Sequence, residues 1–234
     1  MRKSRKSLVV LGLAVGVLSL TAATCNVTVE PSGTPSGKTP VIFVHGYQES
    51  PSMWSAAVTA FEAAGYTAGD ITEFGYDTTQ AASVVSPLLA AEVTHLEQFT
   101  GKPKVDIVSH SFGSMVSRYC IELGGCQGQV ARWMSLAGAD NGTSIANLCG
   151  DNSCKDMNGS TGTIASLQAA WGQMATQGVV VEVQWSPNDG VIIPATSSEE
   201  PAPATNVEVS GSLNHLSIPS DPGVLAETIR FLSA

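Results

Sequence analysis

The stretch KPKVDIVSHSFGSMVSRYC, from Lys102 to Cys120, joins an apolar run to a helical pattern through a short group of small polar residues. Residues 105–108 have the composition of a buried strand, and a helix is predicted to begin at Phe112. Ser111 lies between the two. The segment is therefore either an ordinary turn whose serine caps the helix, or a turn that exposes Ser111 for nucleophilic attack.

Strand and helix patterns alternate along most of the chain. Most of the strand segments are short and almost continuously apolar, as expected of strands that are covered on both faces. This alternation predicts an α/β fold with a mostly parallel six-stranded sheet, helices on both faces and a ligand site at the carboxyl ends of the strands. The predicted strands are residues 41–44, 71–74, 105–108, 133–136, 179–185 and 207–209, and the predicted helices are residues 53–64, 81–99, 112–123 and 223–232.

Residues 141–178 interrupt the alternation. The segment is rich in Gly, Ser, Thr and Asn, and it is predicted to be an insertion above the sheet. Within it, the run DNSCKDMNG (residues 151–159) carries acidic side chains, but their spacing is not that of a calcium-binding loop. We therefore expect a polar loop held by a disulfide, and neither a metal ion nor another cofactor.

The first 23 residues have the pattern of a secretory signal peptide. A basic start is followed by an apolar run over residues 8–20 and by small residues suitable for cleavage. Residues 24–38 contain several Pro, Gly and Ser residues and are expected to form a flexible lead-in that buries nothing. Residues 39–234 are then long enough for one domain with a large core. The mature protein is expected to be secreted.

The charge of the mature chain is strongly negative. Without the four basic residues of the predicted signal peptide, seven lysines and arginines remain against 20 aspartates and glutamates, a net charge of −13. Such a balance argues against binding to a phosphate backbone, so no nucleic-acid partner is expected. It fits a soluble secreted protein, which we expect to be a monomer.

Five cysteines remain after the predicted cleavage site. Export makes disulfides plausible, and the spacing favours two local pairs, Cys120–Cys126 and Cys149–Cys154, with Cys25 left over. Four cysteines allow three pairings, so other connectivities stay open. Zinc is disfavoured because no histidine lies near either pair in the sequence.

Ser111 occupies the third position of Ser109-His110-Ser111-Phe112-Gly113, a form of the turn G-x-S-x-G in which Ser109 replaces the first glycine. Small residues flank the serine because this bend brings a strand and a helix close together. A serine hydroxyl needs a base to accept its proton and an acid to orient that base. In enzymes that use this turn, the acid and then the histidine follow the serine along the chain.

His215 is the histidine that follows both Ser111 and a suitable acid. It stands after the last predicted strand, in GSLNHLSIPSDP, on the carboxyl side of the sheet. Asp189 in WSPNDG is the preferred acid because it follows the preceding strand; an aspartate in an ordinary turn is the alternative. Asp140 in SLAGADNG is the rival acid.

Attack on a carbonyl group places negative charge on its oxygen, which backbone N–H groups must stabilise. The amide of Phe112, the residue after Ser111, is the first expected donor. The second is expected from the loop after the first strand, in VIFVHGYQES, where His45-Gly46 allows a close approach and Tyr47 supplies the N–H.

These motifs resemble the secreted bacterial lipases of the α/β-hydrolase fold, in particular the class 2 and lipase A types. The resemblance rests on VIFVHGYQES, KVDIVSHSFGS, RWMSLAGADNGT, WSPNDGVI and TNVEVSGSLNHLSI, and it extends from about Thr39 to the end of the chain. It implies that residues 39–234 are a catalytic domain in which Ser111 is the nucleophile, Asp189 the acid and His215 the base. Tyr47 and Phe112 would supply the oxyanion-binding amides.

The expected activity is hydrolysis of a lipid or another ester, with transient contact with a lipid interface. The alternatives are a short-chain esterase, a polyesterase or an amidase of the same fold, and a binding module without catalytic activity. The preference for lipid depends on apolar residues expected near the mouth of the site: Tyr47, Phe112, Ile145, Leu148, Val191, Ile192, Ile193, Leu213, Leu216 and Ile218.

Overall fold

The computed structural model describes residues 26–234, so the predicted signal peptide and Cys25 lie outside the described residues. The described chain forms a six-stranded sheet in the order β2-β1-β3-β4-β5-β6, and each pair of neighbouring strands is parallel. This confirms the predicted α/β class. The strands are β1 (Val41–Val44), β2 (Ile71–Phe74), β3 (Val105–His110), β4 (Val130–Leu136), β5 (Val180–Trp185) and β6 (Thr205–Glu208).

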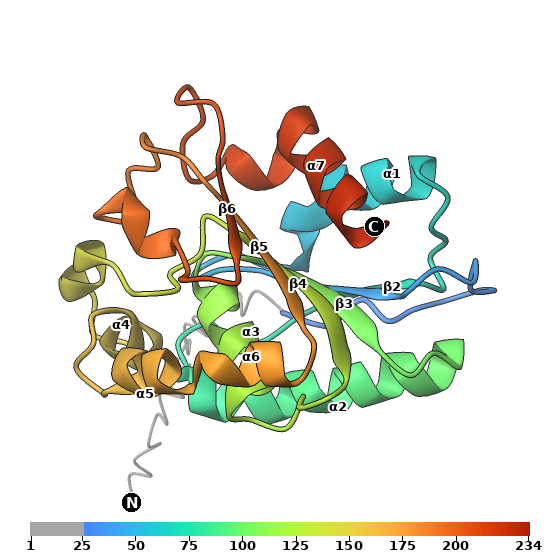
Figure 1. Cartoon of the computed structure of the whole chain (residues 1–234), viewed down its shortest axis with the longest axis horizontal. Coiled ribbons are helices and arrows are strands. Elements are labelled where there is room, and N and C mark those ends of the chain that lie inside the picture. The colour runs from blue at the N-terminus through green and yellow to red at the C-terminus, as the bar shows by residue number, and fades with distance from the viewer. Residues whose placement is uncertain (1–25) are drawn as a thin grey trace, which may run out of the picture.

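Helices cover both faces of the sheet (Figure 1). On one face lie α1 (Ser55–Ala63) and the C-terminal helix α7 (Pro222–Leu232). On the other face lie α2 (Ala82–Thr100) and α3 (Phe112–Glu122), together with the short helices of residues 141–178. The chain order of strands and helices puts the β1–α1 and β3–α3 loops at the same edge of the sheet, where the carboxyl ends of the parallel strands meet.

Strand β1 shows why the predicted strands are continuously apolar. Phe43 packs on the side of α1, with its ring centroid 5.0 Å from that of Trp54 and 5.1 Å from that of Phe61. Its neighbour Ile42 belongs to the core on the side of α2 and α3. Because successive side chains of a strand point to opposite faces and both faces are covered, every residue of β1 is buried.

Strand β3 is longer than predicted by two residues. Ser109 pairs with Val44 and with Ser135, and His110 pairs with Leu136, so the sheet continues up to the residue before Ser111. Backbone pairing stabilises this extension. The buried polar side chains of Ser109 and His110 are accommodated because both form hydrogen bonds with other parts of the structure.

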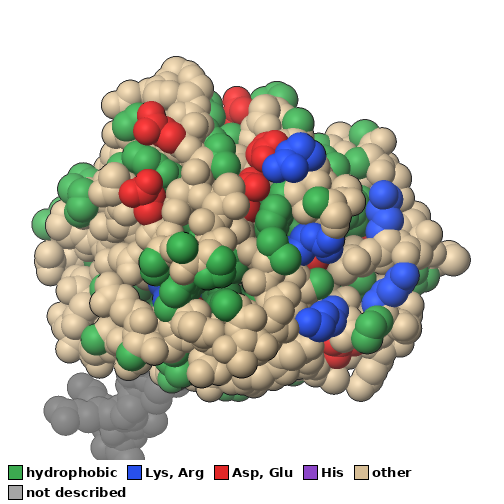
Figure 2. All heavy atoms as spheres, in the orientation of Figure 1, with side chains coloured by type: hydrophobic (Ala, Val, Ile, Leu, Met, Phe, Trp, Pro, Cys, Tyr) green, Lys and Arg blue, Asp and Glu red, His purple; other side chains and the backbone are tan. Residues whose placement is uncertain are grey.

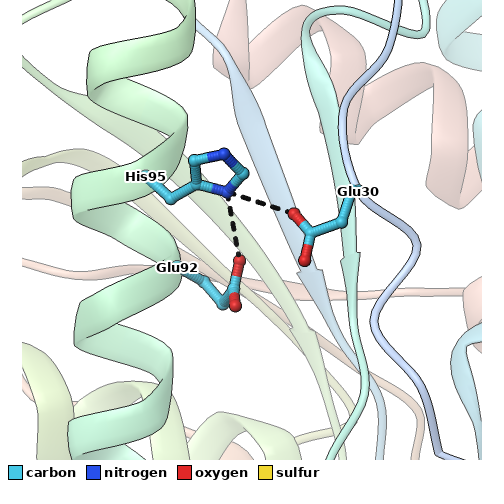
Figure 3. A group of neighbouring side chains, drawn as sticks. All are labelled: Glu30, Glu92 and His95. Atoms are coloured by element: carbon cyan, nitrogen blue, oxygen red, sulfur yellow. Dashed lines mark ion pairs between the residues drawn. The ribbon is translucent and has the colours of Figure 1, made fainter.

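The prediction that the lead-in buries nothing is wrong for its described part, residues 26–38. Val29 forms an antiparallel bridge with Glu73, with N···O distances of 2.9 and 3.1 Å, and Pro31 is buried. Figure 3 shows a further contact, in which Nδ1 of His95 on α2 lies 3.1 Å from Oε2 of Glu30. The segment therefore pairs with the exposed edge of β2, which leaves fewer unpaired backbone groups there.

The run of residues 151–159 contains a helix rather than forming the predicted polar loop, and the whole insertion of residues 141–178 contains four short helices. They are the 3-10 helix η2 (Ser144–Leu148), α4 (Asn152–Met157), α5 (Thr163–Ala170) and α6 (Gly172–Thr176). The carboxylate of Asp156 in α4 is buried and accepts hydrogen bonds from the backbone of Ala82 and from two threonine hydroxyls. These tertiary contacts explain how a short polar sequence is held in an ordered helix.

The two predicted local disulfides, Cys120–Cys126 and Cys149–Cys154, are both confirmed. On the face seen in Figure 2, charged side chains are sparse and the Lys and Arg side chains stand apart from one another. That face of the described residues therefore offers no continuous basic surface. Between residues 26 and 234, no helix is both long and apolar enough to cross a bilayer.

Candidate active site

A cavity of about 430 Å³ opens at the carboxyl ends of the strands. The loops after β1, β3, β5 and β6 all contribute to it, as predicted for a parallel sheet. The η2 and α4 segments of residues 141–178 form another part of its wall. The lining residues are Tyr47, Gln48, Glu49, Ser111, Thr143, Ile145, Ala146, Cys149, Met157, Val191, Ile192, His215 and Leu216.

Ser111 occupies a strained turn between β3 and α3. Its φ of 54° and ψ of −125° lie in a region that side-chain-bearing residues seldom adopt. A Cβ atom at Gly113 would lie 2.4 Å from the carbonyl oxygens of Val44 and His45, and one at Gly46 would lie 2.7 Å from Cβ of Ser111. Glycine at these two positions therefore lets β1 and its loop approach the turn closely.

Ser109, the residue that replaces the first glycine of the motif, is fully buried and hydrogen-bonded. Its hydroxyl donates to the carbonyl oxygen of Met134 at 3.1 Å and accepts from the indole N–H of Trp133 at 3.0 Å. The side chain is thus small enough for the crowded turn and has partners for its polar atom. This substitution is compatible with the strand-to-helix bend at Ser111.

His215 and Asp189, which are 26 residues apart, form a hydrogen-bonded pair. Nδ1 of His215 lies 2.9 Å from Oδ2 of Asp189, and both side chains are almost completely buried. The other carboxylate oxygen accepts from the amides of Val191 at 2.9 Å and Ile192 at 2.6 Å. The carboxylate is therefore fixed by three nitrogen atoms, with one oxygen directed at the imidazole.

The environment shifts the pKa of both members of the pair. Burial lowers the pKa of His215, and the hydrogen bond and charge of Asp189 oppose this effect. Burial opposes ionisation of Asp189, but the contacts with His215 and with the two amides outweigh it and lower the pKa of Asp189. At neutral pH the arrangement holds a carboxylate against a neutral imidazole, which is the form that can accept a proton.

Ser111 and His215 line the same cavity. Across residues 26–234, no hydrogen bond within 3.5 Å joins the Ser111 hydroxyl to the imidazole or to another group. Catalytic hydrogen bonds of this type are often long before substrate binds. Ser111 is only 6% exposed and lines the cavity, so a molecule would reach its hydroxyl through the cavity.

Tyr47 follows Gly46, the residue that approaches Ser111 closely, and Phe112 follows Ser111 itself. Within the described part of the chain, neither N–H has a hydrogen-bond acceptor, whereas the neighbouring amides of Gly46 and Gln48 do. Phe112 is the first residue of α3, so its N–H is not used by the helix. The loop that carries Tyr47 is held by the Tyr47 hydroxyl, which donates to Asp151 at 2.6 Å.

Asp140, the rival acid, belongs to a different cluster. Its carboxylate accepts from the hydroxyl of Ser135 at 2.7 Å, and its backbone oxygen accepts from the guanidinium of Arg118 at 3.0 Å. Arg118 is fully buried and forms ion pairs with Glu122 and Glu200. The structure thus brings Asp189, and not Asp140, to His215.

The Arg118 cluster contains more carboxyl groups than the one guanidinium can neutralise. Burial raises the pKa of Glu200 to about 9; Arg118 opposes this shift, and the carboxyls of Asp140 and Glu122 add to it. Burial likewise raises the pKa of Asp140 to about 7. In the folded protein these carboxyls therefore bind protons at a pH at which they are ionised in the unfolded chain.

We expect the free energy of unfolding to fall as the pH rises from 5 to 9. The folded pKa of Glu200 lies above its unfolded value, so the stabilisation is complete at low pH and is lost as the pH passes through the folded pKa. Urea unfolding at several pH values should show a loss of more than about 1.4 kcal/mol, the linkage of a single pKa unit. Glu200→Gln should flatten the profile, whereas the adjacent control Glu199→Gln should not; equal profiles for both variants would contradict this assignment.

Sequence reasoning did not single out Glu49 or Arg118. Glu49 was detectable as an acid in the loop after β1, and Arg118 as one of two charged residues, with Glu122, on a predicted helix rich in small and apolar residues. Of the apolar residues expected near the mouth of the site, Tyr47, Ile145, Val191, Ile192 and Leu216 line the cavity. Phe112, Leu213 and Ile218 instead pack in the hydrophobic core.

One group of side chains could hold a metal ion by its geometry. The ligand atoms of Glu30, Glu92 and His95 lie within 4.8 Å of one another, between the N-terminal segment and α2 (Figure 3). None of the three lines the cavity at Ser111. The exposed Glu30–His95 pair acts as a contact between two segments of the chain, and we assign no catalytic part to it.

Comparison with known proteins identifies the family. Residues 38–207 match the family described as Lipase (class 2). The match includes Ser111 and Asp189, whereas His215 lies beyond its end. A search of curated proteins finds no match.

Solved structures resemble the chain in fold. The mature form of lipase BlEst2 from Bacillus licheniformis has a TM-score of 0.77 and 18% identity, covering 88% of this chain and 98% of that chain. Aspergillus fumigatus lipase B has a TM-score of 0.74 and 16% identity, covering 88% of this chain but 56% of that chain, so this chain spans about half its length. The Listeria innocua lin2722 product has a TM-score of 0.64 and 15% identity, and the match covers 83% of this chain and 94% of that chain. Together with the match over residues 38–207, these findings show that the chain belongs to the class 2 lipase family and is a carboxylic ester hydrolase of the α/β-hydrolase fold.

Proposed function

We propose that this chain is a secreted lipase that hydrolyses esters of apolar acids through an acyl-enzyme on Ser111. The observation that carries the proposal is that Ser111 and His215 line one largely apolar cavity, while His215 is hydrogen-bonded to Asp189 at 2.9 Å. Two disulfides and an acidic composition support an extracellular location.

In the first step, Oγ of Ser111 attacks the ester carbonyl carbon while Nε2 of His215 takes the hydroxyl proton. The carbonyl oxygen gains negative charge and accepts hydrogen bonds from the amides of Tyr47 and Phe112. The carbon–oxygen bond to the alcohol then breaks, and His215 returns its proton to the leaving alkoxide. Asp189 holds the imidazole in the required tautomer and stabilises its protonated form.

In the second step, water replaces the alcohol. His215 takes a proton from this water as its oxygen attacks the acyl carbon, and the same two amides receive the negative charge. The bond to Ser111 breaks, its oxygen takes the proton from His215, and the acid is released. The lowered pKa of His215 supports this part, since a neutral imidazole is available as the base at neutral pH.

The surroundings of the cavity favour an apolar acyl chain and contact with lipid. Ile145, Val191, Ile192 and Leu216 supply aliphatic surface to its wall. Leu216 is itself 69% exposed, and Leu148, which directly precedes the lining residue Cys149, is 83% exposed. These side chains can enter a lipid surface and so bring the mouth of the cavity to the substrate.

We expect the rate on p-nitrophenyl esters to rise from the acetate to longer acyl chains, and we expect activity on an emulsified triglyceride. Leu148→Ser should lower the rate on the emulsion about tenfold and more than it lowers the rate on a soluble ester. The estimate follows from about 1.5 kcal/mol for removing a leucine side chain from an apolar contact.

Leu88→Ser is the matched control, because Leu88 is 56% exposed but lies on α2 and does not line the cavity. It should leave the ratio of the two rates unchanged. Highest activity on the acetate together with none on the emulsion would contradict the lipase proposal and favour a short-chain esterase. An equal effect of both leucine variants would contradict the proposed contact with lipid.

A further inference from the structure

Glu49, in the loop after β1, joins two parts of the site through one carboxylate oxygen. Oε2 of Glu49 accepts a hydrogen bond from the amide of Gly46 at 2.7 Å. The same oxygen lies 2.8 Å from Nδ1 of His110. Gly46 immediately precedes Tyr47, so this carboxylate fixes the loop that carries one of the two free amides beside Ser111.

His110 is the last residue of β3, directly before Ser111, and its side chain is completely buried. Its Nε2 lies 3.1 Å from the backbone oxygen of His215, on the side opposite to Glu49. The rings of His110 and His215 are also in contact, with centroids 4.6 Å apart. One imidazole thus lies between an acidic side chain and the backbone of the proposed catalytic base.

Both ring nitrogens of His110 face hydrogen-bond acceptors, a carboxylate and a carbonyl oxygen. A ring nitrogen that carries hydrogen donates to the acceptor that it faces, so this imidazole links the Glu49 carboxylate to the backbone of His215. The direction of the pKa shift of Glu49 is consistent with this pairing. Burial opposes its ionisation, but the charge and hydrogen bond of His110 and the Gly46 amide outweigh burial and lower the pKa of Glu49.

We propose that Glu49 and His110 are positioning residues for the ester hydrolysis at Ser111. The pair connects the loops after β1 and β6 with the end of β3, and thereby holds an oxyanion-binding amide and the backbone of His215 in register with the nucleophile. The inference rests on the proposed function, because it assigns these residues a part in the same reaction.

The competing explanation is that the Glu49–His110 pair only stabilises the fold. The nature of its contacts argues against this explanation. A buried ion pair adds little stability compared with apolar residues of the same size, because both charges lose their hydration. Such a pair does supply directional hydrogen bonds. Here these are directed at the backbone of Gly46 and His215, on two loops that are otherwise separate in the sequence.

The test is kcat and KM of Glu49→Ala and Glu49→Gln on a soluble ester, with the concentration of intact sites measured by an organophosphonate. Glu49→Ala should lower kcat about 100-fold, the effect of a misplacement of about 1 Å, while KM changes less than about threefold. Glu49→Gln keeps an oxygen that can accept from His110 and from Gly46, so it should recover kcat to within about tenfold of the unmodified protein.

Glu30→Ala is the matched control because it removes the acid of another Glu–His pair, Glu30–His95, outside the cavity. It should leave kcat unchanged. A kcat of folded Glu49→Ala within about twofold of the unmodified protein would overturn the proposal, as would equal losses in the Ala and Gln variants. If the unmodified protein is not labelled at Ser111, the proposed function itself fails, which separates the two failures.

Discussion

Ser111→Ala is expected to lower kcat for ester hydrolysis about 10⁶-fold while the protein stays folded. The change removes the only side-chain atom of Ser111 that could attack a carbonyl carbon. Across residues 26–234 its hydroxyl makes no hydrogen bond within 3.5 Å, so its loss costs the fold no contact. Alanine also meets the same backbone constraint as serine at a φ of 54°.

Initial rates on a soluble ester and thermal unfolding of the same preparations check this prediction. An organophosphonate should label the unmodified protein on the peptide that contains Ser111 and should not label the variant. Ser114→Ala is a control from the same turn, because Ser114 is buried and hydrogen-bonded to the hydroxyls of Ser109 and Ser135. It should lose about 1 kcal/mol of stability and keep its activity. Full activity in Ser111→Ala would rule out the acyl-enzyme.

Asp189→Asn is expected to lower kcat about 10⁴-fold with little effect on KM. Oδ1 of Asp189 accepts from the amides of Val191 and Ile192, which an asparagine oxygen can also do. The asparagine NH₂ group would then face Nδ1 of His215. That nitrogen would have to accept, which moves the proton to Nε2 and prevents the imidazole from taking the proton of Ser111.

Asp140→Asn separates the two candidate acids. Asp140 lies in the Arg118 cluster, and burial raises its pKa to about 7, so burial stabilises the uncharged form of Asp140, which a neutral amide resembles. We expect its kcat to stay within about threefold of the unmodified protein. Comparing kcat of the two asparagine variants, at equal concentrations of folded protein, decides which aspartate is the acid. A large loss in Asp140→Asn with none in Asp189→Asn would reverse the assignment.

The arrangement of strands and most helices was predictable from local sequence. Residues 41–44 and 71–74 are strands with the predicted bounds, because their short apolar runs suit a sheet that is covered on both faces. The bend at Ser111 was predictable because the small residues around it allow a strand to turn directly into a helix. The two local disulfides followed from cysteine spacing in a chain predicted to be exported.

Other features could not be predicted in this way. The lead-in pairs with β2 because an antiparallel bridge at Val29 uses the free edge of that strand. The polar run of residues 151–159 contains α4 because buried Asp156 accepts hydrogen bonds from α2 and from nearby threonines. In both cases the partner lies far along the chain or is fixed only by packing, and local propensity carries no information about it.

By itself, the sequence determined the α/β class, the strand-to-helix turn at Ser111 and the order of serine, acid and histidine, because these depend on periodicity and on residues close together in the chain. Only the tertiary structure decided that Asp189 rather than Asp140 contacts His215, and that His110 lies between Glu49 and the backbone of His215. Contacts between residues 26 to 105 positions apart depend on how strand ends and loops pack. A hydrogen bond exists only where that packing brings donor and acceptor within about 3 Å.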